Sequence, residues 1–104
     1  MSISFKIEKV QPIDVFDRNI THNVGSMWRE AGCYDAIYNS AGMQAREAYP
    51  FLKRGMDDMI ANQEKYEKLN PENGWGDYNS AVGFLTELVE ACDKFPDGII
   101  RISK

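Results

Sequence analysis

The stretch "ISFKIE", residues 3–8, alternates apolar and polar side chains, and the expected fold is built outward from it. Ile3, Phe5 and Ile7 fall on one face of an extended chain, and polar residues fall on the other. Because a period of two is typical of a strand with one buried face, the pattern predicts a strand over residues 3–10.

A second β-rich run, "IIRIS", occupies residues 99–103 near the other end of the chain and follows the turn-forming residues Pro96-Asp97-Gly98. Two short strands at opposite ends of a chain are satisfied most simply by pairing with each other. We therefore expect an α+β fold, in which the terminal strands form a small antiparallel or mixed sheet that packs against about three helices. Residues 1–104 are expected to form a single domain.

Between these runs the apolar residues recur with the period of a helix. Asn19 and Thr21 are both suitable N-caps for the first helix, and Gly32 is a suitable stop. Asp77 is a credible N-cap for the last. The spacing predicts helices near residues 20–31, 43–62 and 77–94.

Three shorter segments complete the expected architecture. Residues 33–39 can form a short helix or a strand, and we favour the helix, whereas residues 64–69 should add one helical turn. Pro50 lies inside the second helical pattern, so that helix either kinks there or starts near it. On the solvent side of this helix we expect two i,i+4 ion pairs, Lys53 with Asp57 and Arg54 with Asp58.

The composition restricts the classes of partner. The chain carries 12 basic and 16 acidic residues, and no basic cluster is larger than the pair Lys53-Arg54, so we do not expect it to bind duplex nucleic acid directly. Residues 77–97 are acidic, with Lys94 as their only base. This segment could attract a basic partner surface, or it could simply be a solvated helix face.

The chain shows no apolar run of the length of a signal peptide or a membrane span, so we expect a cytoplasmic protein that does not enter a membrane. Cys33 and Cys92 are the only cysteines. In such a compartment, buried reduced thiols are expected rather than a disulfide.

The sequence contains no established catalytic motif: it has no glycine-rich phosphate loop, no Cys-x-x-Cys and no His-Glu-x-x-His. With His22 as the one histidine, no local spacing suggests a metal site, and no cofactor is expected. A nucleophilic pair of Cys33 and His22 is conceivable, but a thiol beside Tyr34 in an apolar stretch is more typical of inert packing. We therefore expect a protein that is not an enzyme.

A polar constellation lies in "NITHNVGSMW", residues 19–28. On a helix Asn19, His22, Asn23 and Ser26 would share one side, and amide and imidazole groups suit a ligand with both donors and acceptors. The alternative is that these side chains cap the helix, satisfy a neighbouring carbonyl or face water.

The loop "NPENGWGDY", residues 70–78, consists of turn-forming residues around a tryptophan. Trp75 could fold back over the last helix and seal the core, or it could form a stacking wall beside the first helix. In the second case Asn73 and Tyr78 would belong to the same site, and Trp75 and Asn23 would line one shared pocket.

The segments "NITHNVGSMWREAG" and "LNPENGWGDY" together resemble an uncharacterised family of small proteins encoded by bacteriophages and their bacterial hosts. The resemblance covers about residues 19–102 and implies a phage-type accessory protein with no established activity. It places five of the candidate residues inside the two family motifs: Asn19, His22, Asn23, Asn73 and Trp75.

Two functional hypotheses follow. The first is a non-enzymatic module that binds or sequesters a small polar, nucleotide-like ligand in counter-defence, with the possibility of a homo-oligomer. The alternative is an acidic inhibitor whose last helix blocks a nucleic-acid-binding site on a host defence protein. For the first hypothesis the candidate ligand-binding residues are Asn19, His22, Asn23, Asn73, Trp75 and Tyr78.

Overall fold

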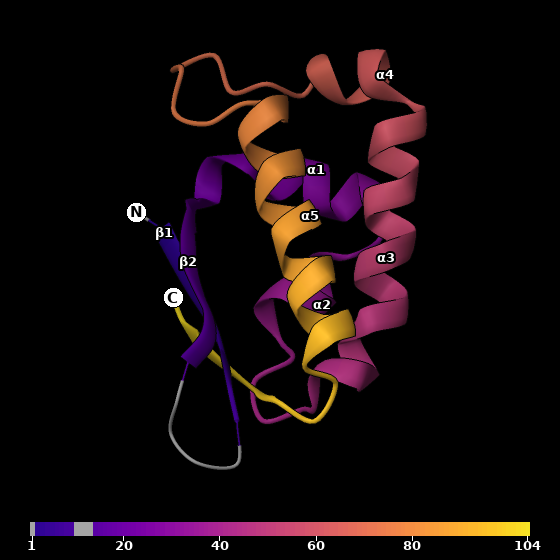
Figure 1. Ribbon diagram of the computed structural model, residues 1–104. Helices are drawn as coiled ribbons and strands as arrows, with labels where there is room; N and C mark the ends of the chain where they lie inside the picture. The colour runs from indigo at the N-terminus through magenta and orange to yellow at the C-terminus, as the bar shows by residue number, and fades with distance from the viewer. Residues whose placement is uncertain (1, 10–13) are drawn as a thin grey trace.

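The computed structural model describes residues 2–9 and 14–104 of the chain. It shows an α+β fold, as predicted, in which a three-stranded antiparallel sheet packs against helices (Figure 1). In chain order the elements are β1 (Ser2–Glu8), β2 (Asp14–Thr21), the 3₁₀ turn η1 (His22–Val24), α1 (Gly25–Ala31), α2 (Tyr34–Tyr38), α3 (Ala45–Ala61), α4 (Gln63–Glu67), α5 (Tyr78–Lys94) and β3 (Ile99–Ser103).

The sheet is built around β1, which lies between the other two strands in the order β2-β1-β3. Strand β3 runs antiparallel to β1, with Ile99 opposite Glu8, so the predicted pairing of the terminal strands is confirmed. Ile3, Phe5 and Ile7 are fully buried, because their alternation turns all three toward the helices.

Strand β2 was not expected, and the helix predicted over residues 20–31 begins too early. Ile20 belongs to β2, where it lies opposite Ile3 of β1 and is buried together with Phe16. A spacing of four residues between two buried side chains satisfies a strand as well as a helix. Here β1 offers hydrogen-bond partners along the whole segment, so the strand forms and α1 starts only at Gly25.

The turn η1 is capped by one of the two predicted residues. The Thr21 hydroxyl accepts a hydrogen bond from the backbone N–H of Asn23, with 3.2 Å between nitrogen and oxygen. The other predicted cap, Asn19, lies inside β2, so that part of the prediction is wrong. Gly32 ends α1 at a φ of +78°, as expected for a C-terminal glycine.

The remaining helices lie close to their predicted positions. Helix α3 begins at Ala45 and continues through Pro50, so the proline does not mark its start. Helix α2 confirms the helical interpretation of residues 33–39, and α4 supplies the extra turn. The Asp77 carboxylate caps α5 by accepting from the backbone N–H of Ser80 at 2.8 Å, as predicted.

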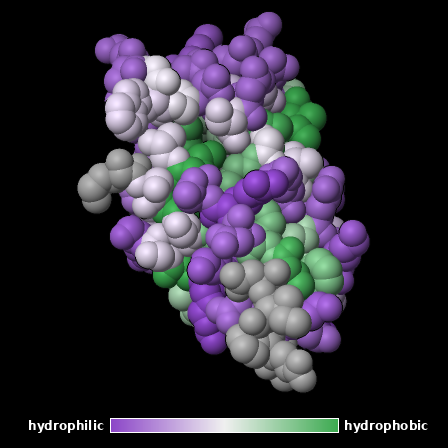
Figure 2. Space-filling view, turned by 60° about the vertical axis from the view of Figure 1, so that its left-hand side comes forward, coloured by the Kyte–Doolittle hydropathy of each residue, from purple (hydrophilic) through white to green (hydrophobic). Residues whose placement is uncertain are grey.

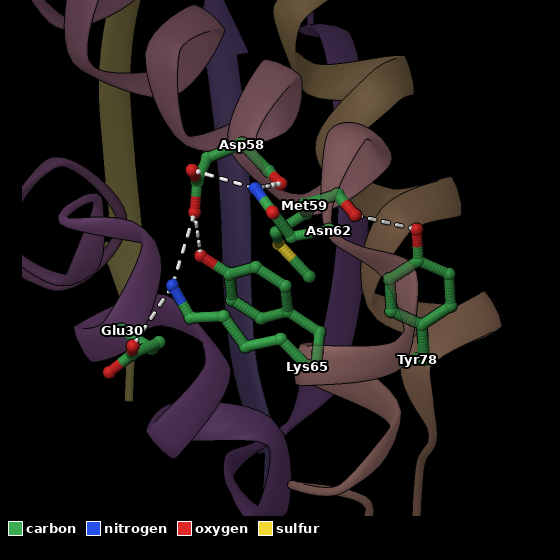
Figure 3. Close-up of polar contacts among 7 residues, drawn as sticks. Glu30, Asp58, Met59, Asn62, Lys65 and Tyr78 are labelled. Carbon is green, nitrogen blue, oxygen red and sulfur yellow. Dashed lines mark hydrogen bonds and ion pairs between the residues drawn. The ribbon is translucent and has the colours of Figure 1, made fainter.

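One of the two ion pairs predicted on α3 is present. Lys53 Nζ lies 2.9 Å from the Asp57 carboxylate. The predicted Arg54–Asp58 pair is wrong, because the Asp58 carboxylate turns toward α4 and accepts a hydrogen bond from the buried hydroxyl of Tyr66 (Figure 3). This contact fixes the corner between α3 and α4.

The helices form layers on one side of the sheet. Helix α5 lies between the sheet and α3 and contacts both (Figure 1). Its inner face includes Leu85 and Leu88, which are fully buried. Within the two described ranges, no helix combines the length and apolarity that a membrane span requires.

The other face of the sheet is polar. Ser4 and Lys6 of β1 are half-buried there, and Arg101 of β3, opposite Lys6, is exposed. Figure 2 turns this side of the molecule forward and shows hydrophilic residues across much of it, with hydrophobic residues visible between them. The sheet therefore has one face in the core and one face toward solvent.

Both cysteines are free thiols in the core, as predicted. Gly55 of α3 packs so closely against Cys33 that a Cβ at Gly55 would lie 2.8 Å from the sulfur atom. Burial raises the pKa of the Cys33 thiol and that of the Cys92 thiol to about 12. Both thiols are therefore protonated at neutral pH.

We predict that Leu85→Ala lowers the free energy of unfolding by about 2 to 5 kcal/mol, because it removes buried methyl groups and leaves a cavity in the core beside α5. Glu90→Ala on the exposed face of α5 should change it by less than about 0.5 kcal/mol. Urea denaturation of the two variants measures both values. Similar losses for both substitutions would mean that the buried face of α5 is wrongly assigned.

The thiols should make the protein less stable in alkali. Their pKa is about 12 in the folded chain and about 8.5 in an unfolded one. Between these values the unfolded chain has lost protons that the folded chain keeps, so the free energy of unfolding falls as pH rises. Cys92→Ala should flatten this slope by up to about 1.4 kcal/mol per pH unit in urea denaturation between pH 8 and pH 11. An unchanged slope would contradict the assignment.

Candidate functional site

The loop that joins α4 to α5, residues 70–77, lies against the turn that follows β2 (Figure 1). At Gly76 the approach is so close that a Cβ would lie 2.6 Å from Thr21 Cγ2 and 3.0 Å from Val24 Cγ1. Gly76 also has a φ of +94°, which glycine adopts without strain. The two sequence motifs singled out above therefore meet in space, across about fifty residues of chain.

A series of hydrogen bonds links these two segments. Asn23 donates to Thr21 Oγ1 from its backbone N–H at 3.2 Å and from its side-chain amide at 2.9 Å. The Asn23 side-chain oxygen accepts from Asn73 Nδ2 at 3.5 Å, the long end of the range for a hydrogen bond. The Asn73 oxygen in turn accepts from the backbone N–H of Trp75 at 2.9 Å. The amides of both motifs thus hold the backbone beside the tryptophan.

Both ends of the loop are tied to the start of α5. The Asn70 side-chain oxygen accepts from the backbone N–H of Tyr78 at 2.8 Å. The bond from the Ser80 backbone N–H, followed by that from the Ser80 hydroxyl, lowers the pKa of Asp77. The Asp77 carboxylate is therefore ionised at neutral pH, next to the tryptophan loop.

Trp75 is 63% exposed, whereas Trp28, the other tryptophan, is fully buried. The alternative in which Trp75 seals the core is therefore wrong. Gly74 and Gly76, on either side of Trp75, both have positive φ values, which glycine adopts without strain in a sharp turn. The alternative, an indole that presents a face to a ligand, stays a prediction.

Tyr78 is buried, although it was grouped with the candidate ligand-binding residues. Its hydroxyl donates a hydrogen bond to the backbone oxygen of Met59 at 2.8 Å, from α5 across to α3 (Figure 3). Its side chain thus joins two helices of the core and does not present a group to the surface.

The predicted polar face of the first helix does not exist. Asn19 is an exposed residue of β2, opposite Ser4 of β1, while Asn23 lies in η1 and Ser26 in α1. The prediction failed because it assumed a single helix across a segment in which strand, 3₁₀ turn and helix follow one another. Of this set, the described hydrogen bonds connect only Asn23 to the tryptophan loop.

His22 contacts Tyr38 of α2 and takes no part in the hydrogen bonds described for the loop. Its Nδ1 lies 2.7 Å from the hydroxyl of Tyr38, which stacks on Tyr34 with 4.4 Å between ring centroids. The Arg29 guanidinium lies over the Tyr34 ring at 4.3 Å. Burial, followed by the neighbouring Tyr34, raises the pKa of Tyr38 against the lowering effect of Arg29. This row of stacked side chains was not predicted from the sequence. The only feature that pointed to it was the i,i+4 pair of tyrosines in "YDAIY".

The described contacts do not bring Cys33 and His22 together as a reactive pair. The Cys33 thiol, whose pKa burial raises to about 12, is not a nucleophile at neutral pH. The His22 ring is hydrogen-bonded to Tyr38. In residues 2–9 and 14–104, no group of three or more His, Cys, Asp or Glu side chains gathers where it could hold a metal ion.

Hollows occur elsewhere on the surface. One of about 370 Å³ lies between α2 and α3, with the half-exposed Phe51 at its wall. Another of about 670 Å³ lies between β2 and α5 and is lined by Asp17, Glu87, Glu90 and Asp93 among others. Neither is lined by residues of the tryptophan loop.

Comparison of the chain with protein-family models, with curated proteins and with solved structures gives no match. The predicted resemblance to phage-encoded proteins therefore stays a prediction.

Gly74 and Gly76 form a matched pair for testing that contact. Both have a positive φ, but a Cβ at Gly74 would meet nothing within 4 Å. Gly74→Ala should therefore destabilise the protein by about 1 kcal/mol, through backbone strain alone. Gly76→Ala should cost about 2 to 4 kcal/mol, because it adds the clash with Thr21 and Val24. Equal losses in urea denaturation would show that the loop does not pack as described.

Proposed function

We propose that this chain is a non-enzymatic binding module that holds a small polar ligand with a planar, nucleotide-like ring against Trp75. The observation that carries the proposal is the 63% exposure of that indole in a loop whose backbone is held on both sides. A tryptophan adds nothing to the turn chemistry of its neighbours, which needs only proline, asparagine and glycine.

The geometry supports stacking as the mode of contact. An indole offers a flat apolar face and one N–H donor, and a base stacked on an aromatic side chain gains about 1 to 3 kcal/mol. Because the loop is already held by Asn70, Asn73 and Asp77, little backbone entropy has to be lost when a ligand binds.

The neighbouring amides would play a second part. In the described contacts, Asn23 and Asn73 each use one side-chain N–H and accept one hydrogen bond. A side-chain amide has two N–H groups and two lone pairs, so each retains capacity for a ligand at the exposed edge of the loop. The proposed site does not include three of the candidate residues. Asn19 lies in β2, His22 is hydrogen-bonded to Tyr38, and Tyr78 lies in the core.

We extend the proposal to a biological role in counter-defence, in which the module sequesters its ligand in the cytoplasm of a host cell. The support for this part is the resemblance to phage-encoded accessory proteins. Sequestration needs affinity and no reaction, which agrees with a protonated Cys33 thiol and a hydrogen-bonded His22.

The acidic face of α5 supports the alternative, a protein inhibitor of a host nucleic-acid-binding enzyme. Glu90 and Asp93 are exposed on it, together with Glu87, which is paired with Arg18 of β2 at 3.3 Å. Such a face could occupy a basic nucleic-acid-binding surface. It does not involve Trp75, so the two functions separate experimentally.

The proposal is tested by titrating the purified protein with adenosine, guanosine, cytidine and uridine while following tryptophan fluorescence. A ring that stacks on Trp75 should quench its emission in a saturable way. Titration calorimetry measures the variants, which lack the reporting indole. Trp75→Ala should weaken binding by about 5-fold to 150-fold, the equivalent of about 1 to 3 kcal/mol, whereas Trp75→Phe should retain part of it.

Phe51→Ala is the matched control, because it removes another exposed aromatic ring, 50% exposed, from α3. It should bind like the parent protein. If Trp75→Ala and Phe51→Ala bind equally well, Trp75 is not the contact. If the folded parent protein binds none of the four nucleosides and no planar cation, the ligand-binding function is wrong and the acidic face of α5 becomes the favoured surface.

A further inference from the structure

The charges around Trp75 select among planar ligands. Glu72 and Asp77, three and two residues from the tryptophan, are both exposed, and residues 69–93 contain no lysine or arginine. The facing turn carries His22 as its one ionisable group, and this ring is hydrogen-bonded to Tyr38. The loop and the turn that faces it therefore contribute two carboxylates and no lysine or arginine.

The start of α5 does not compensate for these carboxylates. The first N–H groups of a helix attract anions such as phosphate. Here the Asp77 carboxylate already occupies that position, with its oxygen 2.8 Å from the Ser80 nitrogen. The chain thus fills its own anion position, and a phosphate would meet the repulsion of Glu72 and Asp77 instead.

We infer that the group bound by Trp75 is a small planar cation, of the kind found in a guanidinium compound or an alkylated nucleobase. Tryptophan is the best aromatic partner for a cation, through the negative face of its ring. Amide oxygens of Asn23 and Asn73 can accept hydrogen bonds from the N–H groups of such a cation. This inference rests on the proposed function, because it takes Trp75 as the stacking surface.

The size of the preference follows from the exposure of the site. In water each carboxylate attracts a cation only weakly, and an exposed cation–π contact adds about as much. Together they should make a cation bind about tenfold more tightly than its neutral counterpart. Because the charges are exposed, salt should reduce the preference toward equality.

Two pairs of probes test how the charge of the ligand affects binding. Comparison of the two pairs also separates the two sources of the cation. The first pair is N-acetylarginine amide and N-acetylcitrulline amide, which share shape but differ in charge. The second is 7-methylguanosine at pH 6 and guanosine. The cation should bind about tenfold more tightly than its neutral counterpart in at least one pair, and that pair identifies the source. Guanosine 5′-monophosphate should bind more weakly than guanosine.

Two double variants with the same change in net charge serve as test and control. Glu72→Gln with Asp77→Asn should lower the preference for the cation from about tenfold to about twofold, the part that the cation–π contact supplies. Asparagine caps a helix as well as aspartate does, so the loop should stay in place. Glu90→Gln with Asp93→Asn removes two carboxylates about 20 Å or more along α5 and should leave the preference intact.

The outcomes separate this inference from the function on which it rests. If neutral and cationic members of both pairs bind equally, or if both double variants behave alike, the inference is overturned while stacking on Trp75 stands. If no probe binds and Trp75 fluorescence does not respond, the proposed function itself fails. A stronger affinity for guanosine 5′-monophosphate than for guanosine would show that the site favours an anion, which also overturns the inference.

Discussion

The central position of β1 determines where the candidate site forms. Its register places Thr21 at the end of β2 opposite Ser2, and Ile99 at the start of β3 opposite Glu8. These two points are separated by the length of β1, about 20 Å. Helix α5, which leads into β3, spans about 25 Å, so it must start near the end where β2 finishes. The topology of the sheet therefore places the tryptophan loop beside η1.

The parts of the fold that could be predicted are those in which one pattern had one interpretation. Residues 3–8 alternate without a break, and the apolar stripe of α5 repeats over four turns, so both elements were recognised. Residues 14–21 do not alternate cleanly. Arg18 occupies a position that faces the helices, where it pairs with Glu87 of α5 instead of entering the core. The charged residue of this ion pair interrupts the apolar alternation, so the sequence pattern did not indicate a strand.

The candidate site divides in the same way. Turn chemistry in "NPENGWGDY" placed a loop correctly and identified the tryptophan as its unexplained member. The prediction that Asn23 and Trp75 line one shared pocket joined two motifs far apart in sequence. The described hydrogen bond from Asn73 to Asn23 brings the motifs together, and the shared pocket stays a prediction. The roles of Asn19 and Tyr78 could not be derived, because each depended on whether the backbone was strand or helix and on which face met the core. Such information comes from tertiary packing.

The structure separates two tasks that the sequence analysis had combined. Hydrogen bonds link the side chains of Thr21, Asn23 and Asn73 to one another and to the Trp75 backbone, so their first effect is to hold the loop in place. This leaves the indole as the large apolar group at the exposed tip. A loop held by directed bonds has few conformations to lose, which makes a single exposed ring effective as a contact.

The electrostatic setting of this ring has the same origin as the fold. The loop must end in a helix cap, because α5 starts there, and Asp77 supplies one. A carboxylate that stabilises the helix therefore also sets the sign of the potential beside the tryptophan. Removing its charge with an asparagine preserves the cap and changes only the potential, so structure and recognition can be separated at that residue. Under the proposed function, the requirement for a helix cap thus also places a carboxylate next to the ring that would bind the ligand.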